Sequence, residues 1–402
     1  MKILHTADWH IGKILHKQSL AEDLNHFFDW MIQTIEEEDI DLLLVSGDIF
    51  DLANPNIRDK EVYYDIMMRL YKSGCQVIIT GGNHDSVGEL NAPKQILSAI
   101  NISVIGGAMQ ELEDELIPVK NASGEIELVV AAVPFLRDRD IRSRQEGQTY
   151  ESRTEAIREG IKDHYQKLAE LCTERYPDVM AITMGHLYAR GVSVSDSERD
   201  IHVGNQAAVE SEMFPAEFKY VALGHIHRPQ QVDADPRIQY SGSPIALSFS
   251  EKEDEKIVII VETTGDQISD IRSLRIPRLR EISKISGSYA DVERELTRYQ
   301  PDFPLPSFLE LEVIEEDFSA VILSKVEELS QTFAENPHFK ILKQKTSFQN
   351  QGLNTAELFE QGTSIEELKP KDVFERKIDS EELDEESRKL LLEAFTELME
   401  MM

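Results

Sequence analysis

Five short polar motifs in this sequence carry side chains of the kinds that can bind metal ions. Their seven oxygen and nitrogen ligands are Asp8, His10, Asp48, Asn83, His186, His225 and His227. Carboxylates, imidazoles and an amide, without sulfur, suit Mn²⁺, Fe²⁺ or Zn²⁺. Seven ligands are too many for one ion but fit two, so the motifs predict a centre that holds two metal ions.

We expect Asp48 to bridge the two ions. One ion would be completed by Asp8, His10 and His227, and the other by Asn83, His186 and His225. Two ions about 3.5–4 Å apart activate a water molecule and stabilise charge during in-line hydrolysis of a phosphate ester. The motifs therefore predict phosphoesterase chemistry.

His84 and Asp85 are the candidate catalytic residues beside this centre. His84 is not needed as a ligand, so we expect it to face the scissile phosphate and donate a proton to the leaving alkoxide. Asp85 is expected to orient His84 or a ligand imidazole through a hydrogen bond. Taken alone, the stretch 77–85 is also compatible with a polar loop that only reverses the chain.

Each motif directly follows an apolar run that predicts a buried strand. These runs are residues 2–6, 41–46, 77–80, 178–184 and 219–223. Helices are predicted between the first three runs, with Asn56 capping one over 57–72 and Ser86 starting the next. Alternating strands and helices imply βαβ units, whose strand ends meet at one edge of a sheet. We therefore predict an α/β fold of the sandwich type with the metal centre at that edge.

Each motif taken singly could also be structural, without binding metal, and the pair Asp8 and His10 is an example. In extended backbone, residues two apart point the same way, which would make this pair half of a metal site. A lone pair of this kind is more often a surface carboxylate and a hydrogen-bonded core histidine. Five motifs with the same placement after a strand argue against that explanation.

The composition limits the class of protein. A chain of 402 residues predicts two or three domains, and its net charge of −33 argues by itself against indiscriminate nucleic-acid binding. Arginines are nevertheless concentrated in residues 137–153 and 272–280. These segments could form a local basic track that contacts DNA, or they could be ordinary solvated surface. Cys75 and Cys172 predict reduced thiols. With no signal peptide and no apolar stretch of about 20 residues, we expect a cytoplasmic protein and no membrane contact.

The motifs DxH, GD, GNHD, GH and GHxH, in this order, resemble those of the calcineurin-like metallophosphoesterases. They are Asp8/His10, Gly47/Asp48, Gly82 to Asp85, Gly185/His186 and Gly224 to His227. Segments 5–12, 47–51 and 195–204 further resemble the SbcD family of bacterial nuclease subunits. This resemblance covers residues 1–275 well and the remainder only in layout.

The resemblance implies a nuclease of DNA repair and recombination that uses two Mn²⁺ ions, with Mg²⁺ or Fe²⁺ as substitutes. It implies 3′-to-5′ exonuclease activity on duplex ends and endonuclease activity on single strands and hairpins. The implied partners are DNA, an SbcC-like ATPase in a heterotetramer with two SbcC subunits, and a second copy of this chain. The dimer would form through helices near 57–72 and 86–99. Since the chain has no GxxxxGK[ST] motif, any ATP hydrolysis must come from a partner.

The same resemblance divides the chain into three parts. Residues 1–275 would form the metallophosphoesterase nuclease domain, 276–346 a smaller α/β domain that caps DNA, and 347–402 an acidic segment that docks the ATPase. An amphipathic pattern over 380–402 predicts a helix, which we expect to dock a partner rather than fold back. Archaeal and eukaryotic relatives carry His where this chain has Asp51, so we assign Asp51 no catalytic role.

Two other functions fit part of the sequence. A phosphatase or cyclic-nucleotide phosphodiesterase with a small substrate would explain the first 230 residues equally well, but not the remainder. A scaffold with a vestigial site is the non-enzymatic alternative. It is disfavoured because all seven ligands and His84 are present.

Overall fold

The computed structural model of the chain describes residues 1–121, 123–141, 150–199, 201 and 208–349. The chain divides into two compact units. Unit 1 comprises Met1–Lys284, Tyr299–Glu310 and Phe333–Lys343, and unit 2 comprises Ile285–Arg298, Leu311–Thr332 and Gln344–Met402. The predicted boundary after residue 275 stays a prediction. The predicted tail helix over 380–402 lies outside the described residues.

The first sheet of unit 1 has six strands in the order β14-β13-β1-β4-β5-β6. Their bounds are β1 Lys2–Thr6, β4 Leu42–Ser46, β5 Gln76–Thr80, β6 Ile102–Ile105, β13 Ile257–Thr264 and β14 Gln267–Arg275. Strands β1, β4, β5 and β6 run parallel, while β13 pairs antiparallel with β1. The parallel part is connected by helices, as the sequence predicted for its first three strands.

The second sheet also has six strands, in the order β11-β12-β10-β9-β8-β7. Their bounds are β7 Leu116–Lys120, β8 Ile126–Ala132, β9 Met180–His186, β10 Phe218–Gly224, β11 Gln230–Val232 and β12 Asp235–Tyr240. The five strands that precede the metal-binding motifs are thus split between two sheets. The expectation of a single sheet edge was wrong, because β9 and β10 pair with β8 and β12 and not with the first sheet.

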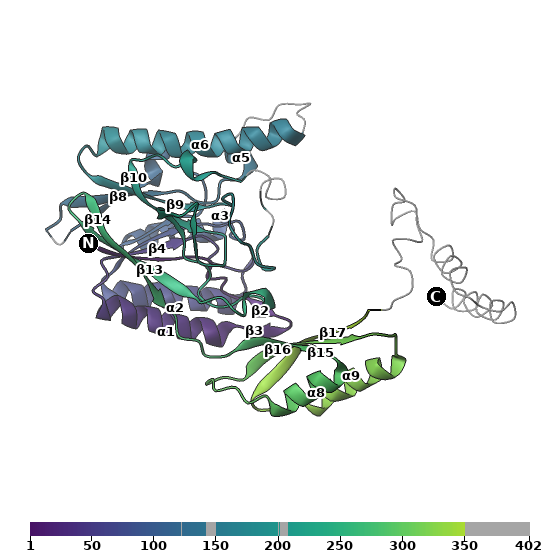
Figure 1. Cartoon of the computed structure of the whole chain (residues 1–402). Helices are drawn as coiled ribbons and strands as arrows, with labels where there is room; N and C mark the ends of the chain where they lie inside the picture. The colour runs from purple at the N-terminus through teal and green to yellow at the C-terminus, as the bar shows by residue number, and fades with distance from the viewer. Residues whose placement is uncertain (122, 142–149, 200, 202–207, 350–402) are drawn as a thin grey trace. The chain divides into compact units, whose positions relative to one another are not determined.

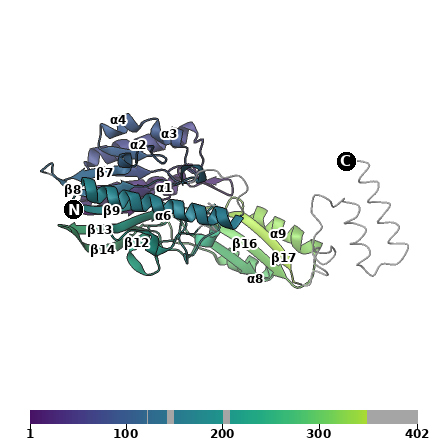
Figure 2. The same ribbon diagram turned by 90° about the horizontal axis from the view of Figure 1, so that it is seen from above.

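The two sheets pack face to face, with helices on both outer faces (Figures 1 and 2). Because side chains alternate along a strand, Leu44 of β4 faces the second sheet and packs in one cluster with Ile182 and Ala222. Its neighbour Leu43 faces outward, toward the helices of the first sheet. Those helices are α1 (Ala21–Glu37) and α2 (Ile57–Ser73), and α6 (Tyr150–Arg175) covers the second sheet.

Helix α1 shows what holds these layers together. Its Phe27, Phe28 and Met31 are buried against the first sheet. Full burial of one such side chain contributes about 1.5–3 kcal/mol. Helix α2 begins as predicted at Asn56, whose side chain accepts the Asp59 N–H while the Asp59 carboxylate accepts the Asn56 N–H.

Further helices and strands lie outside the two six-stranded sheets. In unit 1 these are β2 Ile14–Leu15, β3 Gln18–Ser19, α3 Val87–Asn91, α4 Lys94–Ser98 and α5 Asp138–Ile141. A three-stranded sheet consists of β15 Ile282–Gly287, β16 Ser307–Glu315 and β17 Phe339–Phe348, and unit 2 contains α8 Tyr289–Arg298 and α9 Ala320–Thr332. No strand was predicted at β15. Arg272 and Arg275 lie in strand β14. Within the described ranges, no helix is long and apolar enough to cross a membrane.

Candidate metal centre

The loops that follow β1, β4 and β10 turn through left-handed backbone at the predicted ligands. The φ angles are 53° at Asp8, 46° at His10, 50° at Asp48 and 94° at His225. Non-glycine residues rarely adopt this conformation, and such strain is concentrated at functional sites. The spacing of Asp8 and His10 had suggested that they converge through extended backbone. They converge instead through a turn with positive φ at both residues. Backbone bonds hold this loop, from the Asp8 N–H to the Gly47 carbonyl and from the His10 N–H to the Asp48 carbonyl (both 3.0 Å).

Two glycines let the loops approach closely enough to share ligands. A Cβ atom on Gly224 would overlap the Ser46 carbonyl oxygen, which belongs to the other sheet. A Cβ atom on Gly82 would overlap the carboxylate and backbone nitrogen of Asp48. Neither neighbour can move without displacing a strand end or a ligand. These glycines are therefore part of the site's construction.

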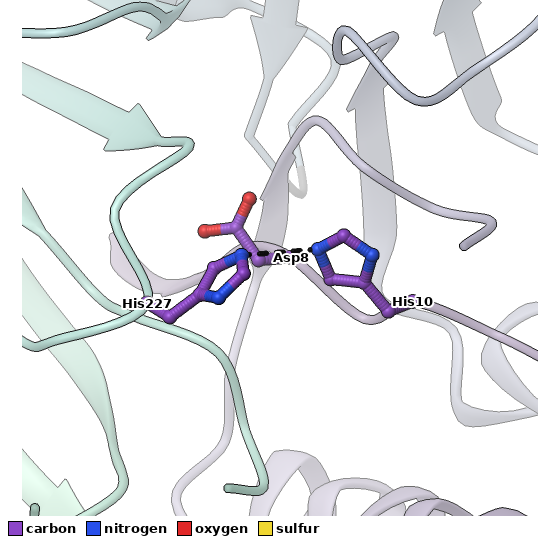
Figure 3. A group of neighbouring side chains, drawn as sticks. All are labelled: Asp8, His10 and His227. Atoms are coloured by element: carbon purple, nitrogen blue, oxygen red, sulfur yellow. Dashed lines mark hydrogen bonds between the residues drawn. The ribbon is translucent and has the colours of Figure 1, made fainter. Parts of the chain in front are cut away.

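The first ligand group consists of Asp8, His10 and His227, all buried (Figure 3). The Nε2 atoms of His10 and His227 face each other at 3.1 Å. Two imidazole nitrogens at this distance share at most one proton or bind a cation between them. The Asp8 carboxylate also accepts the His225 N–H at 2.9 and 3.1 Å, which ties the loop after β10 to the loop after β1.

The second group is centred on the amide of Asn83. Its Oδ1 lies 2.9 Å from His186 Nε2 and 3.1 Å from His225 Nδ1. Ligand atoms of His186 and His225 also lie within 4.8 Å of Asp48. The amide oxygen and both ring nitrogens thus point to the same position.

Asp48 lies between the two groups. Its Oδ2 is 3.6 Å from His10 Nε2 and 3.4 Å from His186 Nε2. The structure therefore brings all seven predicted ligands together, in the two groups that the sequence suggested, with one carboxylate shared. Buried nitrogen and oxygen atoms that converge in this way are the donor set that divalent cations take.

Burial and the charge of each on the other set the pKa values of Asp48 and His186. Burial acts to raise the pKa of Asp48, but His186, then His10, lower it more, and the net pKa is well below its ordinary value. Burial acts to lower the pKa of His186, but Asp48 outweighs it and raises the pKa to about 9. The His186 proton therefore takes the position that a cation would occupy, and metal binding must displace it.

The remaining ligands respond mainly to burial. Burial raises the pKa of Asp8 to about 7, against the opposing charges of His186 and His227. It lowers the pKa of His10 to about 4, and that of His225 well below its ordinary value. His10 and His225 are therefore neutral at pH 7, which is the form of imidazole that binds metal.

His84 lies beside both groups, with its Nδ1 2.7 Å from the Asp51 carbonyl. A carbonyl can only accept, so Nδ1 carries a proton and donates it, which leaves Nε2 available on the other side of the ring. The His84 and His10 rings are 4.7 Å apart, and the His84 N–H donates to Asp48 Oδ1 at 2.9 Å. Burial lowers the pKa of His84, and the positive charge of Arg199 lowers it further.

Asp85 has a different role from the one predicted. Its carboxylate accepts N–H groups of Ile49 (3.1 Å), Phe50 (3.0 Å) and Gly82 (2.8 Å). Among the described residues it makes no hydrogen bond to an imidazole. The expected orientation of His84 by Asp85 was therefore wrong, because these oxygens are already committed to backbone donors. Asp85 fixes the loops after β4 and β5 relative to each other, and burial raises its pKa to about 6.

Several residues near the centre were not predicted. Asp51 Oδ1 lies 3.3 Å from His10 Nδ1 and 3.1 Å from Lys13 Nζ, so this carboxylate lies against the ring of a candidate ligand. In the sequence, only the position of Asp51 three residues after Asp48 indicates that it lies near the centre. The ring of His227 is held by Ser197, whose Oγ lies 2.6 Å from Nδ1. Segment 195–204, which carries part of the family resemblance, thus also contacts a candidate ligand. Asp200 and residues 202–204 lie outside the described residues.

The arginines of segment 272–280 have partners within unit 1. These are Glu38 for Arg272, Glu255 for Arg275, the Asp254 carbonyl for Arg278 and Asp23 for Arg280. Only 5% of the Arg280 side chain is exposed. This pairing argues against the predicted basic track through this segment.

The other basic segment is described only at its start. Arg137 donates to the Asp85 carbonyl at 3.1 Å, which places it beside the loop after β5. Arg139 is largely exposed and lies 3.5 Å from Asp140. Arg142, Arg144 and the side chain of Arg153 lie outside the described residues, so a track here stays a prediction.

Comparison with known proteins agrees with this geometry. Residues 1–229 match the calcineurin-like phosphoesterase family. The SbcD subunit of the nuclease SbcCD from Escherichia coli (strain K12) is 30% identical over 98% of this chain and 97% of its own length. The corresponding subunits are 34% identical in Rhodobacter capsulatus, over 69% of this chain and 70% of that protein, and in Bacillus subtilis, over 65% and 66%.

The fold and the site thus define a metallophosphoesterase. The chain belongs to the calcineurin-like phosphoesterases and, within them, to the family of SbcD nuclease subunits. The family resemblance that the motifs suggested is confirmed.

Proposed function

We propose that this chain is a DNA nuclease subunit that hydrolyses phosphodiesters with two Mn²⁺ ions, for which Mg²⁺ or Fe²⁺ could substitute. The observation that carries the proposal is the position of Asp48 Oδ2, within 3.6 Å of His10 Nε2 and 3.4 Å of His186 Nε2. One ion would be held by Asp8, His10 and His227, the other by Asn83, His186 and His225, and Asp48 would belong to both. Two such ions supply an activated water and neutralise the phosphoryl oxygens.

The chain's own residues position the substrate and move protons. His84 Nδ1–H is committed to the Asp51 carbonyl, so Nε2 is the atom that can face a phosphodiester. When protonated there, it donates to the leaving alkoxide, and after transfer the neutral ring keeps its orientation because the Nδ1 bond is unchanged. The bond from the His84 N–H to Asp48 keeps the ring next to the centre.

DNA is proposed as the substrate because the relatives are named nuclease subunits. We propose 3′-to-5′ exonuclease action on duplex ends and endonuclease action on single strands and hairpins, in DNA repair and recombination. An SbcC-like ATPase would assemble with this chain, two of each, with the segment 347–402 docking it and the module over 276–346 capping DNA. These assignments rest on the relatives' names and on the family resemblance.

A homodimer is proposed through the outer face of α2. Ile57, Tyr64, Met68 and Tyr71 recur at helical spacing on this face and are 46–77% exposed. Ile96 of α4, at 74% exposure, adds a further apolar group from the second predicted dimer helix. Exposed aromatic and apolar residues on one helix face are typical of protein interfaces.

The decisive experiment compares DNA with a small ester. Purified protein with Mn²⁺ is given a labelled hairpin, a single strand and bis-p-nitrophenyl phosphate, each with a metal-free control. We expect cleavage of the DNA substrates, with binding that weakens steeply as salt rises. Cleavage of the small ester alone would instead support a phosphatase or cyclic-nucleotide phosphodiesterase. A flat salt dependence would count against DNA contact.

A further inference from the structure

Segment 195–198 contacts the metal ligand His227 at two points and connects it to a buried ion pair. Ser197 Oγ lies 2.6 Å from the Nδ1 of His227, and Glu198 Oε1 accepts the His227 N–H at 2.8 Å. A third contact comes from Lys256, whose Nζ donates to the His227 carbonyl at 2.9 Å. The ring, N–H and carbonyl of one ligand are thus each held by a different side chain.

A buried carboxylate lies behind these contacts. Glu251 is fully buried, and its Oε2 lies 2.6 Å from Lys256 Nζ, so the carboxylate is ionised and only accepts hydrogen bonds. Ser197 Oγ lies 2.5 Å from Glu251 Oε1. The Leu247 N–H also donates to this carboxylate, and the hydroxyls of Ser195, Ser243 and Ser248 lie within hydrogen-bond distance of it.

The chemistry of these groups fixes the direction of the hydrogen bonds. A serine hydroxyl has one proton, and the ionised Glu251 oxygen takes it. Ser197 must therefore accept at His227, so His227 Nδ1 carries the proton. The unprotonated Nε2 then faces His10 and Asp8, which is the orientation that a metal ligand needs.

We propose that Ser197, supported by Glu251 and Lys256, is a positioning residue that sets the tautomer and ring orientation of His227. The proposal rests on the proposed metal centre, and it gives the segment 195–198 a physical role there. Groups that orient a ligand in this way contribute about 10–100-fold to metal affinity. The effect should be confined to the ion held by Asp8, His10 and His227.

The test uses the full chain as Ser197→Ala, with Ser197→Thr as the conservative variant. Ser250→Ala is the matched control, because the Ser250 hydroxyl accepts the Asp196 N–H at 2.8 Å and holds the same segment without touching His227. In metal-free protein labelled with ¹⁵N-histidine, the His227 signal is assigned by its loss in His227→Gln. Wild type, Ser197→Thr and Ser250→Ala should show protonated Nδ1, and Ser197→Ala should show mixed tautomers.

Calorimetric titration with Mn²⁺ alone then measures the two binding steps. In Ser197→Ala one step should weaken about 10–100-fold and the other should stay unchanged, while Ser197→Thr and Ser250→Ala should match wild type. An unchanged tautomer in Ser197→Ala, unchanged Mn²⁺ affinity, or an equal loss in Ser250→Ala would each overturn the proposal. If wild type bound no Mn²⁺, the proposed function would fail, and the tautomer alone would decide the role of Ser197. Thermal unfolding of each variant checks that it is folded.

Discussion

The two halves of the candidate metal centre hold their histidines in different ways. His186 and His227 both direct Nε2 toward the cluster and use Nδ1 for support. For His186 the support is a backbone carbonyl, that of Ser46 at 3.0 Å. For His227 it is the Ser197 hydroxyl with the buried Glu251 behind it. The ring of His186 is therefore positioned by the backbone, and the ring of His227 depends on particular side chains.

The largest effect is expected from Asp48→Asn, which should weaken both halves of the centre. Both groups share this carboxylate, so both should lose affinity for Mn²⁺, and cleavage should fall by more than the roughly 10–100-fold typical of outer-shell changes. Calorimetry with Mn²⁺ and a DNA cleavage assay measure the two effects. Loss of only one binding step would mean that Asp48 belongs to one half.

His84→Ala should reduce cleavage without changing either half. We expect both Mn²⁺ binding steps to be retained and the cleavage rate to fall about 10²–10⁴-fold, the usual contribution of a general acid. Single-turnover kinetics with a labelled hairpin measure the chemical step. Full activity in this variant would remove His84 from the mechanism.

Metal removal should affect stability through both halves together. The buried carboxylates of Asp8 and Asp48 repel each other, and a bound cation would relieve that repulsion. At Mn²⁺ concentrations about 100 times the dissociation constant, binding adds roughly 2.7 kcal/mol for one site. Thermal unfolding with Mn²⁺ and with EDTA should show the difference, and Asp48→Asn should show almost none. An equal response in Asp48→Asn would place the stabilising ion elsewhere.

The smallest expected effect comes from Ser46→Ala, which leaves the carbonyl that supports His186 in place. The Ser46 hydroxyl donates to the Ala222 carbonyl at 2.9 Å, a bond between strands of the two sheets. Its loss should cost about 0.5–1.5 kcal/mol of unfolding free energy. Mn²⁺ affinity should not change, in contrast to Ser197→Ala. A weakened binding step would show that side chains also support the His186 half.

The candidate ligands could be predicted from the sequence because each lies at or just after the end of a strand, where chain order alone places it. Asn83 and His186 are of this kind. Contacts between loops could not be predicted in the same way. Ser197 meets a ring 30 residues further along the chain, and Asp85 meets amides that are 35 and 36 residues earlier. Serine and aspartate are common in polar loops, and only the closed sandwich decides which amide or ring each one meets. The division of the strands into two sheets is likewise set by long-range pairing.

The hydrogen bonds of Asp85 have a consequence for how this region opens. One carboxylate accepts amides from the loops after β4 and β5, so neither loop can expose those amides to solvent alone. The amide protons of Ile49, Phe50 and Gly82 should exchange with deuterium at one common, slow rate, as a single cooperative unit. The Asp48 and Asn83 ligands, which flank these amides in the sequence, would then be released in the same rare opening event.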